Sequence, residues 1–264
     1  MILASDTVSS LSLMVAVGYL VSALALRNRE TAARLIALLT WLVHAVLLAG
    51  GFSGDAPRFG FASALSVTVW LIAAVVAVET HFYPQLKIRW SLCLLGSVVV
   101  LLAMVFPGAP LPPSTSVWLP LHWALGIASY GLFGVAVAHA LYMGRTEWRM
   151  RQASNLGGGM PLLMIERLTF RFVGAGFALL SASLLVALVF REALYGQGTA
   201  MRWDHKTIFS ILSWLAFALL LVGRTRFGWR GRRAMRMLYA GAGLLFLAYV
   251  GSRFVLEVVL GRMP

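Results

Sequence analysis

The stretch Thr207–Val222, TIFSILSWLAFALLLV, decides the fold, and the run Arg224–Arg236, RTRFGWRGRRAMR, follows it almost directly. The first stretch is uncharged and approaches the length of about 20 apolar residues that cross about 30 Å of hydrocarbon. The second contains six arginines and no acidic residue. An apolar segment that ends in a dense run of arginines is typical of a membrane-spanning helix whose loop stays in the cytoplasm.

The same alternation of apolar segments and loops continues along the whole 264-residue chain, which is 60% hydrophobic and only 12% charged. Soluble domains are about half apolar and about a quarter charged. Backbone polar groups in lipid must be satisfied within their own segment, so the apolar stretches are predicted to be helices. We therefore expect one all-α domain over residues 1–264, a bundle of eight transmembrane helices. The expected spans are Thr7–Leu26, Leu35–Phe52, Phe61–Val78, Trp90–Phe106, Pro120–Met143, Phe172–Phe190, Thr207–Val222 and Met237–Leu256.

Positive charge is unevenly divided between the loops. Of the 22 Lys and Arg residues, 16 fall in the four loops that follow the first, third, fifth and seventh spans. The positive-inside rule places these loops in the cytoplasm and both termini outside. The net charge of +13 is then explained by membrane orientation, without nucleic acid as a partner, and anionic membrane lipids are the expected neighbours of the basic loops.

Two histidines open spans on the same, outer side of the membrane. His122 lies at the start of the fifth span and His205 just before the seventh. Two neutral imidazoles from different helices can hold haem iron axially, or equally copper or zinc. Asp204 could orient the His205 ring through a hydrogen bond. The spacing alone favours a simpler interpretation, in which both are interfacial histidines that hydrogen-bond to loops and water.

Other outer-side residues also allow two interpretations. Tyr249, Arg253 and Glu257 form one stripe on a regular helix, where Arg253 either pairs with Glu257 and reaches towards the headgroups or binds a ligand carboxylate. Trp118, Trp123 and Trp203 either form a floor for a flat ligand or belong to an ordinary aromatic belt.

The remaining reactive side chains carry weaker signals. His44 lies near the middle of the second span, where an ionisable group suggests function by default; a neutral imidazole bonded to a neighbouring helix is the simpler expectation. His81 and His139 are expected at the interface. Cys93 is the only cysteine, so an intramolecular disulfide is excluded and we expect it to be a packing residue. The chain shows no nucleophile with a base, no paired carboxylates and no phosphate loop, so we do not expect an enzyme.

Several motifs resemble those of one known family. The run Trp203–Lys206, WDHK, the arginine run from Arg224 and the triplet Tyr249–Gly251, YVG, resemble the C-terminal half of the CcsA-type cytochrome c assembly proteins. His122, followed by the pair Ser129–Tyr130, resembles their first external histidine helix. The whole chain is most similar to the small YpjD-like branch, with HemX-like proteins as relatives, and the resemblance is most specific between residues 120 and 257.

This resemblance implies a multi-pass protein of the bacterial inner membrane that binds haem b. Larger members of the family present haem on the outer face above a tryptophan-rich loop that ends in Trp-Asp-Pro-Lys, with two external histidines as ligands. Here the loop would be Tyr195–Lys206, and His122 matches the first external histidine. The implied partners are other cytochrome c maturation proteins.

The chain departs from this family pattern in four places. The tryptophan-rich run is reduced to Trp203, Gly223 stands where a histidine precedes the Thr-Arg pair, and the second external histidine is missing. His205 stands in place of the motif proline, so our hypothesis is that His122 and His205 are the axial ligands, with Arg253 facing a propionate. The alternative is a membrane scaffold or a regulator of haem biosynthesis whose haem site has been lost.

Overall fold

The structure, a computed structural model, describes residues 2–25, 29–53, 58–83, 89–110, 116–152, 162–190 and 204–261. The expectation of an all-α membrane protein is confirmed. Within these residues, seven helices are long and apolar enough to cross a membrane, and one apolar helix, Ser91–Val105, is shorter. The chain divides into two compact units, Met1–Pro112 with Arg253–Pro264, and Pro113–Ser252, called unit 1 and unit 2 below.

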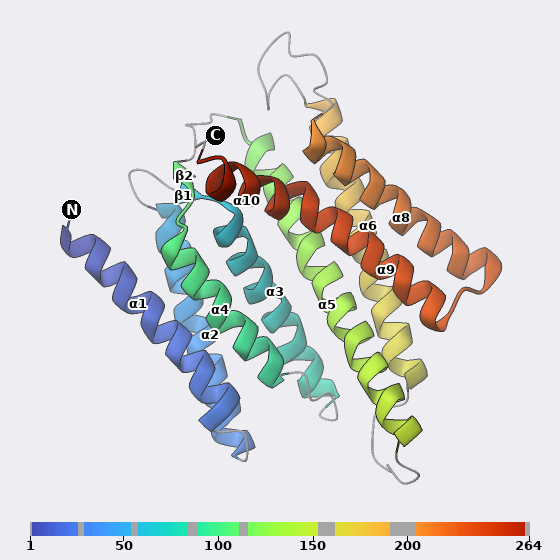
Figure 1. Ribbon diagram of the computed structural model, residues 1–264, viewed down its shortest axis with the longest axis horizontal. Coiled ribbons are helices and arrows are strands. Elements are labelled where there is room, and N and C mark those ends of the chain that lie inside the picture. Colours follow the sequence, from blue (N-terminus) through green and yellow to red (C-terminus); the bar gives the residue numbers. More distant parts are fainter. Residues whose placement is uncertain are drawn as a thin grey trace. The chain divides into compact units, whose positions relative to one another are not determined.

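The described part of unit 1 contains the helices α1 to α4 and one short strand pair, all labelled in Figure 1. Apolar side chains such as Val15 and Val100 are almost completely buried between α1 and α4, whereas others such as Val46 are more than half exposed, as expected for a surface that faces lipid tails. Cys93 is buried in the same cluster, which agrees with a packing role. The elements are α1 (Ile2–Leu20) with a π-helical turn (Val21–Ala25), α2 (Glu30–Ser53), β1 (Arg58–Phe59), α3 (Phe61–Phe82), α4 (Arg89–Val105) and β2 (Ala109–Pro110).

A pair of tryptophans joins α2 to α3. The Trp41 and Trp70 rings stack with their centroids 4.6 Å apart. Each indole N–H donates to the backbone carbonyl of the other residue, at 3.0 and 3.1 Å. The reciprocal bonds satisfy both polar groups inside the apolar span, where water is absent. The pair therefore fixes the register between these two helices.

The strand pair closes one end of unit 1. β1 and β2 are antiparallel, and Phe59 faces Ala109. Gly108 has a φ of +82°, and a Cβ on Gly60 would lie 2.7 Å from the Gly108 Cα, so the close approach requires glycine at both positions. The Glu257 carboxylate lies beside Gly60 and accepts a hydrogen bond from the Phe61 backbone N–H at the start of α3.

Unit 2 is built from four helices that lie side by side (Figure 1). Its elements are α5 (Trp118–Gln152), α6 (Leu162–Val189), α8 (His205–Phe227) and α9 (Gly231–Phe246), which continues into a π-helical turn, η2 (Leu247–Gly251). The same helical run then passes through α10 (Ser252–Phe254) into a further π-helical turn, η3 (Val255–Val259).

Two stacked phenylalanines form the centre of unit 2. The Phe133 ring of α5 and the Phe217 ring of α8 are parallel, with centroids 3.7 Å apart, and both side chains are buried. Gly176 of α6 and Gly241 of α9 face these rings, and an added Cβ would approach them to 3.1 and 3.0 Å. Small residues that let helices approach closely are a common device of membrane bundles.

Most of the observed helices extend beyond the expected spans. α5 runs past Met143 to Gln152, and α6 begins at Leu162, ten residues before Phe172, because the backbone hydrogen bonds of a helix lie within the segment and can continue beyond the hydrocarbon. α9 likewise begins among the arginines, at Gly231. Two π-helical turns interrupt the last run, so the regular stripe expected of its polar residues does not hold there.

Replacing Phe133 by alanine should destabilise unit 2 by about 2 kcal/mol. The variant loses the packing of the ring and leaves a cavity in its place. The loss of stability is smaller than in a water-soluble protein, because the helices remain in lipid when they come apart. Phe227, which is 72% exposed on α8, provides the matched control, and Phe227→Ala should change stability by less than about 0.5 kcal/mol. Reversible unfolding of the detergent-solubilised protein in SDS measures both; equal losses would contradict the assigned core.

Candidate functional site at the histidine end of unit 2

His122 is bonded to the last turns of α6. Its Nδ1 lies 3.0 Å from the Ser183 backbone carbonyl and 3.1 Å from the Ser183 hydroxyl. The hydroxyl in turn donates to the His122 carbonyl at 3.2 Å. A few residues away, Trp118 of α5 stacks on Phe190, which follows α6, with centroids 3.5 Å apart. The beginning of α5 and the end of α6 are thus joined, and we call this part, with the beginning of α8, the histidine end.

These contacts decide the protonation of the His122 ring. A carbonyl oxygen can only accept, so Nδ1 must carry the proton that it donates to Ser183. In the neutral imidazole, Nε2 is then the unprotonated nitrogen. Within the described part of the chain, no hydrogen bond reaches Nε2. This arrangement, one ring nitrogen bonded to a carbonyl and the other bearing a lone pair, is usual for a metal-ligating histidine.

His205 is the first residue of α8, and its side chain is exposed. Asp204 is the N-cap of this helix, and its Oδ1 accepts a hydrogen bond from the Thr207 backbone N–H at 2.9 Å. Partial burial of the carboxyl acts to raise the pKa of Asp204, but bonds from Thr207 and the charges of Lys206 and His205 outweigh it and lower that pKa. Asp204 therefore carries a negative charge at the helix start, where a carboxylate is favourable.

Lys206 connects the beginning of α8 with its surroundings. Its Nζ lies 5.3 Å from the centre of the Tyr249 ring in η2, within the range of a cation–π contact. Its positive charge is also close enough to interact electrostatically with the His122 ring. The structure thus brings His122, Asp204, His205 and Lys206 to the same end of unit 2.

The structure does not bring every expected site residue together. Among the described residues, the rings of His122 and His205 make no contact with each other, and no group of three or more His, Cys, Asp or Glu side chains is arranged to hold a metal ion. Trp123 is half-buried on α5 beside His122, and Trp203 lies outside the described residues. Arg253 belongs to unit 1.

Arg253 lies 3.7 Å from Glu257 in unit 1, so the ion pair considered from the sequence is present but long. Phe254, between them, packs edge-to-face on Phe61 at 5.3 Å. Because Glu257 also accepts the Phe61 N–H, the pair helps to join the last helical turns to the start of α3.

Two further histidines are completely buried. In unit 1, His44 bonds through Nδ1 to the Tyr19 hydroxyl at 3.2 Å and through Nε2 to the Ser66 hydroxyl at 2.8 Å, which confirms the expectation of a histidine bonded to neighbouring helices. The expectation for His139 was wrong: it is buried in unit 2 against the Phe172 ring of α6, because α5 and α6 continue together beyond the expected span.

The sequence alone did not identify the hydrogen-bond and ion-pair partners of two residues that it had singled out. Ser183 is the partner of His122, and Glu166 of α6 is the partner of Arg224 on α8. A signal existed for both. Ser183 is polar inside an apolar span, and Glu166 is one of the few acids near many arginines; polar groups at membrane depth usually have a named partner.

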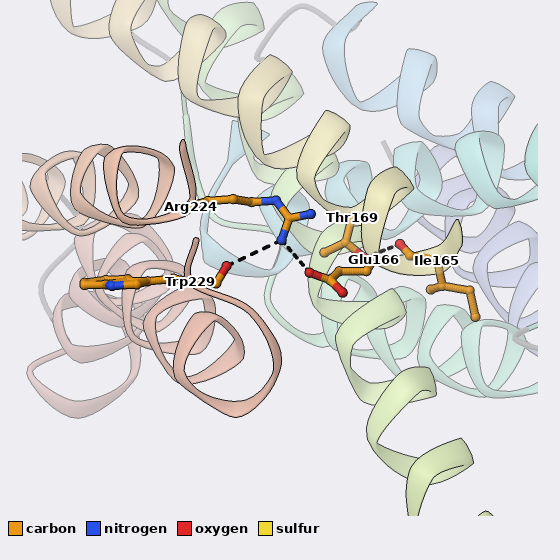
Figure 2. Close-up of polar contacts among 5 residues, drawn as sticks. All are labelled: Ile165, Glu166, Thr169, Arg224 and Trp229. Atoms are coloured by element: carbon orange, nitrogen blue, oxygen red, sulfur yellow. Dashed lines mark hydrogen bonds and ion pairs between the residues drawn. The ribbon is translucent and has the colours of Figure 1, made fainter. Parts of the chain in front are cut away.

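Figure 2 shows the Arg224–Glu166 pair. It joins the end of α8 to the beginning of α6, at the opposite end of unit 2, which we call the arginine end. The Arg224 guanidinium binds the Glu166 carboxylate and lies 3.8 Å from the centre of the Phe170 ring. It also donates to the Trp229 carbonyl at 3.5 Å. The pair therefore holds the turn between α8 and α9 against α6.

Gly223 makes room for the Trp229 ring in this turn. A Cβ at position 223 would lie 2.3 Å from the indole. The Trp229 backbone N–H donates to the Gly223 carbonyl at 3.0 Å. Gly228 ends α8 in the left-handed conformation, at φ +62°. The Arg233 guanidinium lies 4.0 Å from the centre of the same indole.

Comparison with known proteins decides the family. A family described as cytochrome C assembly protein matches residues 5–260, nearly the whole chain. The chain belongs to the cytochrome c assembly family. This confirms the resemblance inferred from the WDHK and arginine runs and from the His122 helix, and one family match covers both compact units.

Relatives of known name agree with this assignment. The inner membrane protein YpjD from Escherichia coli K12 is 27% identical over 261 residues, covering 85% of this chain and 98% of YpjD. An uncharacterised 28.8 kDa protein from Azospirillum brasilense is 29% identical over 209 residues, covering 75% of this chain and 76% of that protein. The cytochrome c biogenesis protein CcsA from Mesostigma viride is 25% identical over 166 residues, 54% of each chain. With seven span-length helices among its described residues, this cytochrome c assembly protein is a multi-pass protein of the inner membrane. No solved structure gives a significant match.

The packing explains one departure from the family pattern. Gly223 stands where larger members carry a histidine, and here the space of that side chain is filled by Trp229. A histidine at this position would collide with the indole, so in this chain the position serves helix packing.

Substituting Gly223 by alanine should destabilise the protein by about 1–3 kcal/mol, the usual result of overpacking, because the new Cβ meets the Trp229 ring. Gly174, in α6, has open space around an added Cβ, and Gly174→Ala should be neutral or stabilising by up to about 1 kcal/mol. Thermal unfolding followed by circular dichroism compares the two variants; a neutral Gly223→Ala would contradict the packing described.

Proposed function

We propose that this protein binds haem reversibly at the histidine end of unit 2, between α5 and α8, and handles it during cytochrome c assembly. Family membership supports a role in cytochrome c assembly, and CcsA is among the relatives named for cytochrome c biogenesis. His122 and His205 are the proposed axial ligands of haem b.

The observation that carries this proposal is the bond from His122 Nδ1 to the Ser183 carbonyl. It fixes the ring orientation and leaves the Nε2 lone pair for an iron atom, and it makes that nitrogen more basic. The His122 imidazole therefore fits as a ligand of haem iron.

The second proposed ligand is fixed less firmly. His205 lies at the exposed start of α8, whose backbone is secured by the Asp204 cap, so its side chain is free to turn towards a ligand. A haem held at one half-buried and one exposed histidine would be released more easily than one held by two buried ones. We propose that this asymmetry suits a protein that passes haem on.

Further residues complete the proposed site. Trp123 would contact the flat face of the porphyrin through its ring, which has the appropriate shape and apolarity; Trp203, expected from the sequence to do the same, lies outside the described residues. Asp204 would orient the beginning of α8. Arg253, expected from the sequence to face a propionate, belongs to unit 1 and is not part of the proposed site.

Haem, when bound, supplies the redox-active iron and its axial coordination positions. The protein's own residues bind and orient it, and the described part of the chain shows no nucleophile paired with a base. We therefore propose a binding and transfer role and no enzymatic activity. Other cytochrome c maturation proteins in the same membrane would be its partners.

The proposed location of the site follows from the topology. α4, with 17 residues, is at the short end of the range that crosses a bilayer, and we propose that it is the eighth span. With eight spans and the basic loops in the cytoplasm, both termini and the histidine end lie on the outer side. Haem would then be presented at the outer face.

Titration of the detergent-purified protein with haem tests the proposal. The wild type should develop the spectrum of a low-spin, bis-histidine haem. His122→Ala and His205→Ala should each weaken binding by more than the roughly 10–100-fold that the loss of an outer-shell partner costs. His81, an exposed histidine in α3, is the matched control, and His81→Ala should bind like the wild type.

The possible contrary outcomes separate the alternatives. A wild type that stays colourless on titration would contradict haem binding and favour the membrane scaffold or regulator. A wild-type spectrum retained in His205→Ala but lost in His122→Ala would reject His205 as a ligand. A spectrum unchanged in both variants would place haem elsewhere.

A further inference from the structure

The turn between α8 and α9 concentrates positive charge that the protein itself does not neutralise. The segment Arg224–Arg236 holds six arginines and no acidic residue. Arg224 is paired with Glu166. Among the described residues, the other five arginines make no ion pair with a carboxylate. These five are exposed: Arg226, Arg230, Arg232, Arg233 and Arg236.

The turn lies at a membrane surface whichever way the chain is inserted. The span-length helix His205–Phe227 ends immediately before it, and the span-length run Gly231–Val259 begins immediately after it. Only three residues separate the two helical runs. The arginines around it are therefore held at the depth of lipid headgroups.

Part of this surface is rigid. The Trp229 ring packs closely against Gly223. Its backbone N–H donates to the Gly223 carbonyl, and its own carbonyl accepts a hydrogen bond from Arg224 (Figure 2). The Arg233 guanidinium lies over the indole at 4.0 Å. A guanidinium ordered in this way loses less conformational entropy when it binds an anion.

The remaining arginines extend the same surface. Arg232, Arg233 and Arg236 lie within one turn of the first part of α9 and share a face of the helix. Arg230 precedes this helix as its N-cap residue. Several guanidiniums beside an interfacial tryptophan match a phosphate diester, which guanidinium binds in a bidentate manner, next to the glycerol region that tryptophan prefers.

We propose that the α8–α9 turn is a binding site for the phosphate headgroup of an anionic phospholipid. The ion pair between Arg224 and Glu166 has a defined part in it: it neutralises the one arginine that faces α6 and fixes the turn, so that the others face the lipid. The site is independent of the proposed haem site and lies at the other end of unit 2.

Lipid binding to the detergent-purified full chain, resolved by native mass spectrometry, tests this proposal. The probes are phosphatidylglycerol and phosphatidylcholine with identical acyl chains. The wild type should bind the first phosphatidylglycerol molecule more tightly than the first phosphatidylcholine molecule. Each arginine near an anionic surface contributes about fivefold in apparent affinity, so Arg230→Gln/Arg232→Gln should lose about 25-fold in that preference.

Two further variants make the result specific. Arg145 and Arg151 are exposed near the end of α5, and Arg145→Gln/Arg151→Gln removes the same charge from another basic region; it should retain the preference. Arg230→Lys/Arg232→Lys keeps the charge and should recover most of it. All variants should keep the helical circular dichroism of the wild type.

Three results would overturn the proposal. The first is an equal affinity of the wild type for both lipids. The second is an equal loss in the α5 variant, which would show a diffuse effect of net charge. The third is displacement of phosphatidylglycerol by millimolar inorganic phosphate, which would show a site for a free anion.

Discussion

A polar group inside a bilayer must find its partner within the protein, and this constraint explains most of the ordered contacts described above. Water is absent from the hydrocarbon region, so an unsatisfied group there costs several kcal/mol. Trp41 and Trp70 satisfy this requirement because each indole N–H donates to the backbone carbonyl of the other residue. His44 satisfies it through hydrogen bonds to the hydroxyls of Tyr19 and Ser66 on the two neighbouring helices. Each solution joins two helices, so the same bonds that satisfy polar groups also set the helix register.

The same constraint prepares His122 for its proposed role. Its Nδ1 is satisfied by the Ser183 carbonyl, and that bond leaves a lone pair on Nε2 in a fixed direction. At the opposite end of unit 2, the Arg224–Glu166 pair satisfies one arginine and leaves its neighbours exposed at the membrane surface. In both places, a contact within the protein leaves another polar group available for a ligand: the Nε2 of His122 in the first case and the exposed arginines in the second.

Hydropathy, charge and motif resemblance predicted the helical membrane fold and the family, because apolar length and the positions of arginines are direct consequences of the bilayer. The sequence marks Ser183 and Glu166 as polar groups that need a partner, but it could not name those partners, since neither spacing nor composition encodes which helices adjoin. The buried position of His139 was missed for the same reason. Gly223 looked like a lost ligand in the sequence, and only its contact with Trp229 shows what the position does in this chain.

The protonation of His122 in the haem-free protein is the most direct test of the account. Selective ¹⁵N labelling of histidine, with His122→Ala to assign the signal, allows solid-state NMR in lipid bilayers to observe each ring nitrogen. We predict a proton on Nδ1 and none on Nε2 at neutral pH. A proton on Nε2, or on both nitrogens, would show that the bond to Ser183 does not fix the ring and would contradict the proposed ligand site.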